Sequence, residues 1–138
     1  MRVGLFAALA VISVSPALAQ SLVPPPAPPG IEVPDWALPI GPRDLWSDDG
    51  RDEDYNHLVR APHGFSHERL RRADPLYDLV LVTNWNWPDA EPGRGSAIFI
   101  HRWRRPRHPT AGCVAFDPSD LLWLARRMPP GSRVAVRR

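Results

Sequence analysis

The sequence predicts one small α+β domain that is mostly β-structure with a single C-terminal α-helix. Short apolar runs bounded by Asp, Asn, Pro and Gly recur in the second half of the chain, which is typical of buried strands. The clearest helix signals gather over residues 117–128. Residues 1–30 have the composition of a leader and a linker, so the rest of the 138-residue chain must form a single core.

The N-terminus has the three parts of a secretory signal peptide. Arg2 supplies a positive charge, residues 3–14 form an almost unbroken apolar run, and residues 17–19 read Ala-Leu-Ala, an A-x-A cleavage site. The apolar run is shorter than the roughly 20 residues that span a bilayer, and Gln20 is not a lipidation cysteine. We therefore expect residues 1–19 to be removed on secretion to the periplasm or cell envelope, which leaves no stable membrane anchor.

Two segments follow the predicted cleavage site. Residues 23–30 read V-P-P-P-A-P-P-G, a composition that favours extended polyproline II and cannot form a packed core. We therefore predict a proline-rich linker over residues 20–30 and a folded domain over residues 31–138.

Buried strands are predicted at Leu79–Val82 and Ala97–Ile100, because both are short apolar runs between turn-forming residues. The connection between them, residues 84–95, is rich in Asn, Pro and Gly and is expected to be a long loop with several turns. A short helical turn is expected over Ser66–Arg72, with Ser66 as its cap.

The predicted helix has start and stop signals at both ends. Asp117 is a suitable N-cap, Pro118 suits the first turn, and Asp120 interacts favourably with the N-terminal dipole. Its apolar face consists of Leu121, Leu122, Leu124, Ala125 and Met128. Residues 129–131 read Pro-Pro-Gly and end the helix, and Val134–Val136 is expected to form a last strand.

The charge balance argues against a nucleic-acid partner. The formal net charge of the chain is +2, and it falls to +1 when Arg2 is removed with the leader. A nucleic-acid binder normally carries a clear basic excess on one face, so we expect no such partner.

Cys113 is the only cysteine of the chain, so a disulfide within it is impossible. Secretion leads to an oxidising compartment in which paired cysteines are usual, and a lone thiol there needs an explanation. Three interpretations follow from the residue alone: a buried thiol that packs as a small hydrophobe, an intermolecular disulfide, and a catalytic thiolate.

His101 and Cys113 together favour the catalytic interpretation. His101 ends an apolar run, so its backbone is held by a strand while its imidazole can point into a cleft. Cys113 follows Gly112 and precedes the capped helix, so we expect its sulfur beside free backbone N–H groups, which lower the thiolate pKa and can hold an oxyanion. A loop between the two can bring the thiol within hydrogen-bond reach of the imidazole.

Other assignments stay open in the same loop. His108 is nearer to Cys113 in the sequence and is the fallback base. Four arginines of this loop could contact carboxylates of a peptide substrate. They are Arg102, Arg104, Arg105 and Arg107.

A metal site and a sugar-binding surface are two alternatives of a different kind. Three histidines and a glutamate could ligate zinc, although no second cysteine and no H-E-x-x-H pattern supports this. They are His57, His63, His67 and Glu68. Trp85 and Trp87 could stack on sugars, although tryptophans in a small domain more often fill its core.

Two segments carry a family resemblance. Residues 95–101 read G-S-A-I-F-I-H and residues 109–115 read P-T-A-G-C-V-A. Together they resemble the His…[Ser/Thr]-x-Gly-Cys signature of the L,D-transpeptidase (YkuD-type) family, especially its short secreted branch. Three further segments look like the W-x-D-D, Y-N and Y-D-L segments of that branch: residues 46–49, 55–56 and 76–80. The likeness spans about Leu38 to Val136.

This resemblance implies an L,D-transpeptidase-like β-sandwich, apparently without the family's leading strands. It implies an enzyme that cuts peptidoglycan stem peptides after an L-centre, forms a thioester, and passes the acyl group to an amine or to water. No cofactor and no metal are implied.

The resemblance also implies a role for each residue of the motif. Cys113 would be the nucleophile and His101 the base, with the backbone carbonyl of Arg102 orienting the imidazole. The amides of Gly112 and Cys113 would contribute to an oxyanion hole. Thr110 would shape the turn before the cysteine.

The chain departs from the family pattern in two places. Ala111 stands where the family often has His, and Ala115 stands near a usual basic or amide residue, so substrate contacts must come from elsewhere. The linker replaces the leading strands, so we expect Ile31–Ile40 to pack in extended form across the exposed sheet. Two alternatives to the transpeptidase remain: an L,D-carboxypeptidase, and a truncated, non-catalytic peptidoglycan-binding module.

Overall fold

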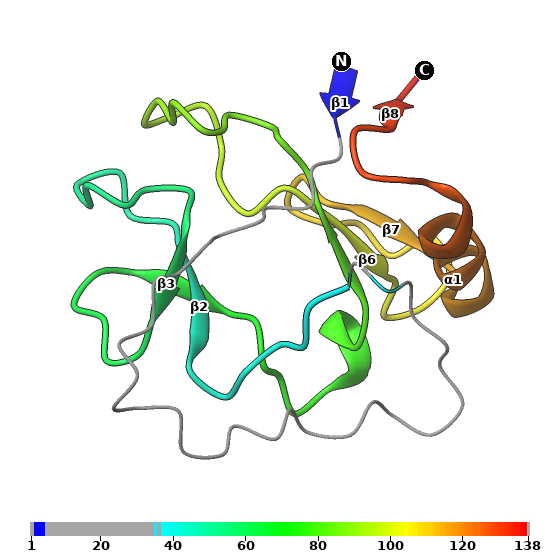
Figure 1. The fold of residues 1–138 in the computed structure, drawn as a ribbon, viewed down its shortest axis with the longest axis horizontal. Coiled ribbons are helices and arrows are strands. Elements are labelled where there is room, and N and C mark those ends of the chain that lie inside the picture. The colour runs from blue at the N-terminus through cyan, green and yellow to red at the C-terminus, as the bar shows by residue number, and fades with distance from the viewer. Residues whose placement is uncertain (1, 5–34, 36, 138) are drawn as a thin grey trace.

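A computed structural model describes residues 2–4, 35 and 37–137 of the chain (Figure 1). In chain order its elements are β1 (Arg2–Gly4), β2 (Asp44–Ser47), β3 (Leu58–Arg60), β4 (His67–Arg69), the short 3-10 helix η2 (Pro75–Tyr77), β5 (Val80–Val82), β6 (Phe99–Arg102), β7 (Val114–Phe116), α1 (Pro118–Arg127) and β8 (Arg133–Ala135). The described part is mostly strands with one α-helix, which confirms the predicted α+β class.

The strands form two three-stranded sheets and one separate pair. The first sheet has the order β3–β2–β4 and is antiparallel, and the second has the order β5–β6–β7 with β6 and β7 parallel. The helix α1 lies beside the second sheet, on the side away from β2 and β3 (Figure 1). The pair β1–β8 includes residues of the predicted leader, so removal of the leader would leave β8 without this neighbour.

Two hydrophobic cores form on opposite faces of the second sheet, because successive side chains of a strand alternate between faces. Leu81 and Ile100 point toward α1 and pack with Leu121 and Ala125. Phe99, on the other face, packs with three buried side chains from the first sheet and η2. They are Trp46, Leu70 and Tyr77. The sheet β5–β6–β7 is therefore the middle layer of the molecule.

The helix prediction over residues 117–128 is confirmed. The Asp117 carboxylate accepts a hydrogen bond from the Ser119 backbone N–H at 2.9 Å, as an N-cap does. The last turn closes when the Met128 N–H donates to the Leu124 carbonyl at 2.8 Å. The apolar runs predicted as strands overlap β5, β6 and β8. Compared with the predictions, β5 begins one residue later, β6 lies two residues further along the chain, and β8 lies one residue earlier.

The expected helical turn over Ser66–Arg72 is wrong. Residues His67–Arg69 form β4 and pair antiparallel with β2, in the register Leu45↔Arg69 and Trp46↔Glu68. A single helical turn fixes several residues for one hydrogen bond, whereas a neighbouring strand offers a ladder of them. Tertiary pairing therefore overrides the local cap signal.

The expected packing of Ile31–Ile40 is described only in part, because Ile31, Val33 and Trp36 lie outside the described residues, as do the linker and most of the leader. Ile40 packs against the Trp46 core, as expected. Leu38 is 73% exposed and does not contribute.

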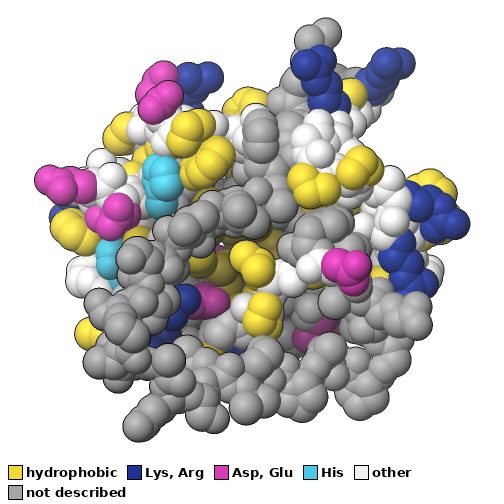
Figure 2. Space-filling view, viewed as in Figure 1, with side chains coloured by type: hydrophobic (Ala, Val, Ile, Leu, Met, Phe, Trp, Pro, Cys, Tyr) yellow, Lys and Arg dark blue, Asp and Glu magenta, His cyan; other side chains and the backbone are white. Residues whose placement is uncertain are grey.

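Figure 2 shows basic side chains gathered over α1, while acidic side chains are scattered over this face of the molecule. Within the described residues, no helix has the length and apolar character needed to cross a membrane.

Candidate active site

The register of β6 and β7 brings His101 and Cys113 to the same face of the second sheet. His101 lies opposite Ala115 in this parallel pair, and Cys113 comes directly before β7. Continuing the register puts Cys113 opposite Phe99, whose backbone N–H approaches the thiol sulfur at 3.5 Å. Cys113 and His101 are thus one strand apart and two residues out of step, a separation of about 8 Å between Cα atoms for ordinary strand spacing and rise.

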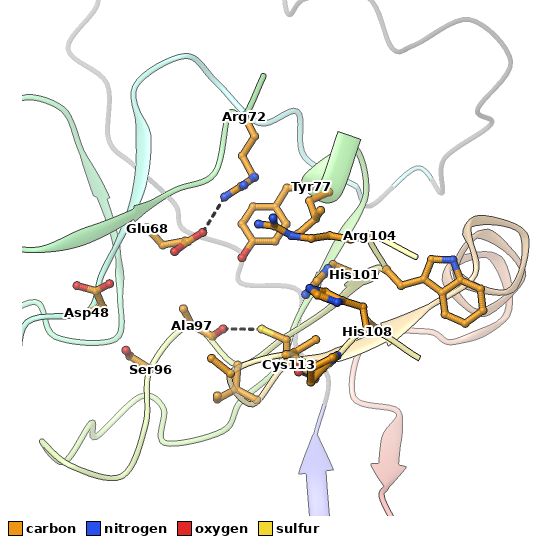
Figure 3. Close-up of a pocket in the computed structure, with 17 residues that line it drawn as sticks. Asp48, Glu68, Arg72, Tyr77, Ser96, Ala97, His101, Arg104, His108 and Cys113 are labelled. Atoms are coloured by element: carbon orange, nitrogen blue, oxygen red, sulfur yellow. Dashed lines mark hydrogen bonds and ion pairs between the residues drawn. The ribbon is translucent and has the colours of Figure 1, made fainter. Parts of the chain in front are cut away.

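Both side chains line one pocket of about 420 Å³ between the two sheets. Figure 3 shows the Cys113 sulfur and the His101 ring on one side of this pocket, and Asp48 and Glu68 on the other. The predicted turn residue Thr110 also lines it. The structure therefore collects side chains from the end of β2, from β4 and β6, and from the loop before β7 around a single cavity.

The imidazole of His101 is held by its own strand. Its Nδ1 is 2.7 Å from the Arg102 carbonyl oxygen, so Nδ1 carries the proton and donates it. The ring is 4% exposed and meets the Tyr77 ring edge-on at 5.3 Å between centroids. This tautomer leaves Nε2 as the nitrogen that can accept a proton.

Burial lowers the pKa of His101, and the positive charges of Arg72 and Arg104 lower it further, against the raising effect of the Arg102 carbonyl and Glu68. The imidazole is therefore neutral at neutral pH. A neutral imidazole can act as a base.

Cys113 is a thiol at rest rather than a thiolate. Its Sγ–H donates to the Ala97 carbonyl oxygen at 3.2 Å. Burial raises the pKa of Cys113, Glu68 adds to the rise, and the Phe99 N–H lowers it by less. The expectation that backbone N–H groups lower this pKa is therefore wrong in its net sign, because desolvation of the sulfur outweighs the hydrogen bond. Attack by this sulfur requires a base that takes its proton.

The turn before Cys113 has a conformation that suits glycine. Gly112 has a φ of +128°, and a Cβ at this position would lie 3.0 Å from the Ile98 Cδ1. The Thr110 hydroxyl donates to the Cys113 carbonyl at 2.6 Å and receives the Gly112 N–H at 3.4 Å. Thr110 thus stabilises the turn, as expected from its position. Its hydroxyl is also the hydrogen-bond partner of the Gly112 N–H in this structure.

Asn56 holds Ala97, which lines the pocket beside Cys113, and sequence reasoning gave Asn56 no role beyond the family likeness. It is 2% exposed, and its Oδ1 accepts from the Trp46 indole at 2.9 Å and from the Ala97 N–H at 3.0 Å. Its Nδ2 donates to two carbonyls of the β5–β6 connection. Asn56 therefore ties the first sheet to Ala97, whose carbonyl receives the thiol proton of Cys113. This structural role of Asn56 can be recognised only from contacts between segments that are far apart in the sequence.

The arginines of the β6–β7 loop are placed differently from one another. Arg104 lines the pocket together with the fallback base His108. Arg102 turns away and lies 3.9 Å from Asp78. Arg105 and Arg107 are exposed and do not line this pocket. Of the four, Arg104 is the one that can meet a bound ligand there.

The histidines considered as metal ligands are engaged elsewhere. The Nε2 of His63 is 2.7 Å from the Asp52 carboxylate, and Nδ1 of His57 and of His67 each contact a backbone carbonyl two residues earlier. Among the residues that the structure describes, no three His, Cys, Asp or Glu side chains form a group that could hold a metal ion. The metal alternative is therefore not supported.

A thiol and an oriented imidazole on one face of a sheet, at the wall of a pocket, are the two components of a cysteine-dependent acyl-transfer site. The family model of the L,D-transpeptidase catalytic domain (YkuD) matches residues 20–136. The chain belongs to this family, whose members act on peptidoglycan in the cell envelope. No curated protein and no solved structure matches the chain.

Proposed function

We propose that this protein is a cysteine-dependent L,D-transpeptidase that acts on peptidoglycan stem peptides through a thioester on Cys113. The observation that carries the proposal is the β6–β7 register, which puts Cys113 and His101 on one face and in one pocket. The family match supports the reaction class, and the geometry supports the assignment of the two residues.

The first half of the reaction follows from the resting states of the two side chains. As the Cys113 sulfur attacks the donor carbonyl, Nε2 of His101 takes the thiol proton. The amides of Gly112 and Cys113 are proposed to hold the oxyanion of the tetrahedral intermediate. When the intermediate collapses, the protonated His101 gives its proton to the leaving amine, and the acyl group remains on sulfur.

The second half uses the same groups in reverse. An acceptor amine attacks the thioester, His101 takes a proton from it, and the Cys113 sulfur leaves and recovers a proton. The Arg102 carbonyl keeps the imidazole oriented through both halves, because its hydrogen bond to Nδ1 does not depend on substrate. If water is the acceptor, the same steps describe an L,D-carboxypeptidase.

Export is the second part of the proposal. The N-terminal pattern of residues 1–19 supports cleavage before Gln20 and a mature protein in the periplasm or cell envelope, without a membrane anchor. Intact-mass measurement of the exported protein checks this, since the mature chain should begin at Gln20. A membrane-bound species that keeps residues 1–19 would contradict it.

Mass spectrometry of purified sacculi tests the catalytic proposal. The mature protein should form an acyl-enzyme and change the stem peptides, and Cys113→Ala should do neither while keeping its fold. New cross-links indicate an amine acceptor, and shortened stems without cross-links indicate water. If the wild type and Cys113→Ala both leave the sacculi unchanged and form no adduct, the non-catalytic, peptidoglycan-binding alternative is favoured.

A further inference from the structure

Basic side chains are concentrated toward the C-terminal end of the chain. Residues 121–138 contain five of the 17 basic side chains and none of the 15 acidic ones, although the formal net charge of the whole chain is only +2. The remaining residues are therefore acidic in balance. A cluster of one sign creates a local positive field, which attracts anionic partners whatever the net charge of the molecule.

The outward side of α1 carries part of this cluster. Leu121 and Ala125 are buried in the core beneath the helix, so side chains about half a turn away point to solvent. They are Trp123, Arg126 and Arg127, and all three are exposed. Figure 2 shows basic side chains gathered over this helix. Trp123 therefore faces solvent with the two arginines of the last turn beside it.

The strand β8 continues the cluster beyond the helix. Val134 packs against the core of α1, so the alternation of the strand turns Arg133 and Ala135 away from that core. Arg133 is exposed, as is Arg137 two residues after the strand. Removal of the leader takes β1 away from β8 and buries none of these side chains. We refer to five residues together as the basic face: Trp123, Arg126, Arg127, Arg133 and Arg137.

The acidic side chains of α1 lie at its other end. Asp117 caps the N-terminus and Asp120 lies in the first turn, whereas Arg126 and Arg127 lie in the last turn. An anionic partner that docks on the last turn of α1 and on β8 thus meets positive side chains of both elements.

Trp123 favours a lipid surface over a glycan as this partner. The Arg127 guanidinium carbon lies 4.6 Å from the centroid of the Trp123 ring, so one face of the indole is unavailable for stacking on a sugar. The side chain is nevertheless 54% exposed. Tryptophan and arginine are side chains that gather at membrane interfaces, where the indole lies at the level of the headgroups and the guanidinium binds phosphate oxygens.

We propose that the basic face is a peripheral docking surface for the anionic phospholipid headgroups of a membrane. This inference goes beyond the proposed enzymatic reaction and uses only the proposed export, which brings the mature protein to a membrane surface rather than to nucleic acid. Each arginine near an anionic leaflet contributes roughly fivefold in affinity. The apolar side of α1 stays in the core, so this docking is reversible and differs from an inserted anchor.

Docking through the basic face leaves the candidate active site open. The pocket with Cys113 and His101 lies on the face of β5–β6–β7 opposite to α1. Figure 1 shows α1 and β8 on the side of the molecule away from β2 and β3. A protein bound through α1 and β8 therefore directs its pocket away from the lipid.

Vesicle sedimentation tests the proposal with the exported protein, purified after removal of its leader. We expect binding to vesicles of equal parts phosphatidylglycerol and phosphatidylcholine at low salt, and none to phosphatidylcholine alone. Binding should be lost at about 1 M salt, where the Debye length is about 3 Å. The tryptophan emission should shift to the blue on binding, and Trp123→Phe should remove this shift although five other tryptophans remain.

Matched substitutions separate the basic face from net charge. Arg126→Gln together with Arg127→Gln should weaken vesicle binding by roughly 10- to 30-fold, and the corresponding pair of lysine substitutions should restore most of it. The control is Arg105→Gln with Arg107→Gln, which removes the same charge from exposed sites of the β6–β7 loop and should keep the affinity. Arg133→Gln should weaken binding by roughly fivefold, so the test does not depend on the helix variant alone.

Several results would overturn the proposal. They are no binding to the anionic vesicles, equal binding to the neutral ones, or a loss in the control pair as large as in the helix pair. Tighter binding to a short DNA duplex than to the vesicles would assign the basic face to a different polyanion. Protection of Cys113 from a thiol reagent by the vesicles would show that the pocket side of the molecule docks instead.

Discussion

The two faces of the sheet β5–β6–β7 are built from the same strands and do different things. On the face toward α1, Leu81 and Ile100 are 2% and 0% exposed and pack with the apolar side chains of Leu121 and Ala125. On the opposite face, Phe99 is just as buried, but His101 and Cys113 share that face with it and border a pocket. Residues that are adjacent in sequence, such as Ile100 and His101, therefore belong to different environments.

Strand alternation thus places packing residues on one face of the sheet and the proposed catalytic residues on the other, so neighbours in sequence have different roles. A slip of one residue in the register of β6 would put the imidazole into the helix core and Ile100 into the pocket. The apolar face resists such a slip, because it would bury an imidazole among the side chains of α1 without a hydrogen-bond partner. The helix-covered face thus secures the geometry of the site.

The largest effect is expected from His101→Ala. Loss of the base should slow acylation of Cys113 by about 10²- to 10⁴-fold, measured by intact-mass kinetics with a stem peptide donor. His108→Ala is the control, because His108 also lines the pocket but is held by a loop rather than by a strand. If His108→Ala abolished acylation and His101→Ala did not, His108 would be the base, and the His101 face of the sheet would have no catalytic role.

A substitution on the face toward α1 should lower the stability of the fold rather than the rate of acylation. Ile100→Ala removes a fully buried side chain from the α1 core and should lower the free energy of unfolding by about 2–5 kcal/mol. Denaturant unfolding measures this. The folded fraction should acylate at close to the wild-type rate, and a large loss of rate in the folded fraction would show that the two faces are not separable.

Gly112→Ala should affect both stability and acylation, because Gly112 lies in the turn directly before Cys113. The positive φ of Gly112 and the 3.0 Å approach of an added Cβ to Ile98 should cost about 1–3 kcal/mol of stability. Acylation should slow in parallel, because relief of this strain moves the Cys113 amide. Thermal unfolding and intact-mass kinetics on the same sample check both effects. Unchanged values for both would mean that the turn accommodates a side chain freely.

The pH dependence of stability is the smallest expected effect and should come from the pocket face. The folded pKa of Cys113 is raised above its ordinary value, so this contribution is full below about pH 9.0 and is lost as pH rises through the folded pKa. The folded pKa of His101 is depressed, so its contribution is present above about pH 6.5 and is lost as pH falls through the folded pKa.

Melting temperatures across this pH range test the assignment. Cys113→Ala should flatten the alkaline side of the profile, and His101→Ala the acidic side. Ile100→Ala should lower the whole profile and keep its shape. If the Cys113 and His101 variants keep the wild-type shape, the pH dependence originates outside the pocket.

Sequence reasoning succeeded for elements that local residues define. The helix over residues 117–128 carries its own cap, its proline at the first turn and its stop signal, so its boundaries needed no tertiary information. The two apolar runs that form β5 and β6 were readable because hydrophobic runs between turn formers report burial directly.

Sequence reasoning failed where a distant segment overrides the local preference. Residues 66–72 have a helix cap signal, but β2 supplies a pairing edge and residues 67–69 join the sheet. The expected direction of the Cys113 pKa shift is wrong for the same reason, because burial raises this pKa by more than the hydrogen bond from the Phe99 N–H lowers it. Burial depends on what packs over a residue, and no local pattern contains that information.

Local residue patterns suffice to predict the α+β class, the capped helix, and the pair of side chains proposed to carry out the chemistry, since a histidine at a strand end and a cysteine after glycine are local features. Contacts between distant segments put Cys113 and His101 at the same pocket, tie Ala97 to the first sheet through Asn56, and place Asp48 across the pocket from the thiol. The physical reason is that register and sheet packing are set by contacts between segments far apart in the chain, whereas caps and apolar runs are set within a few residues.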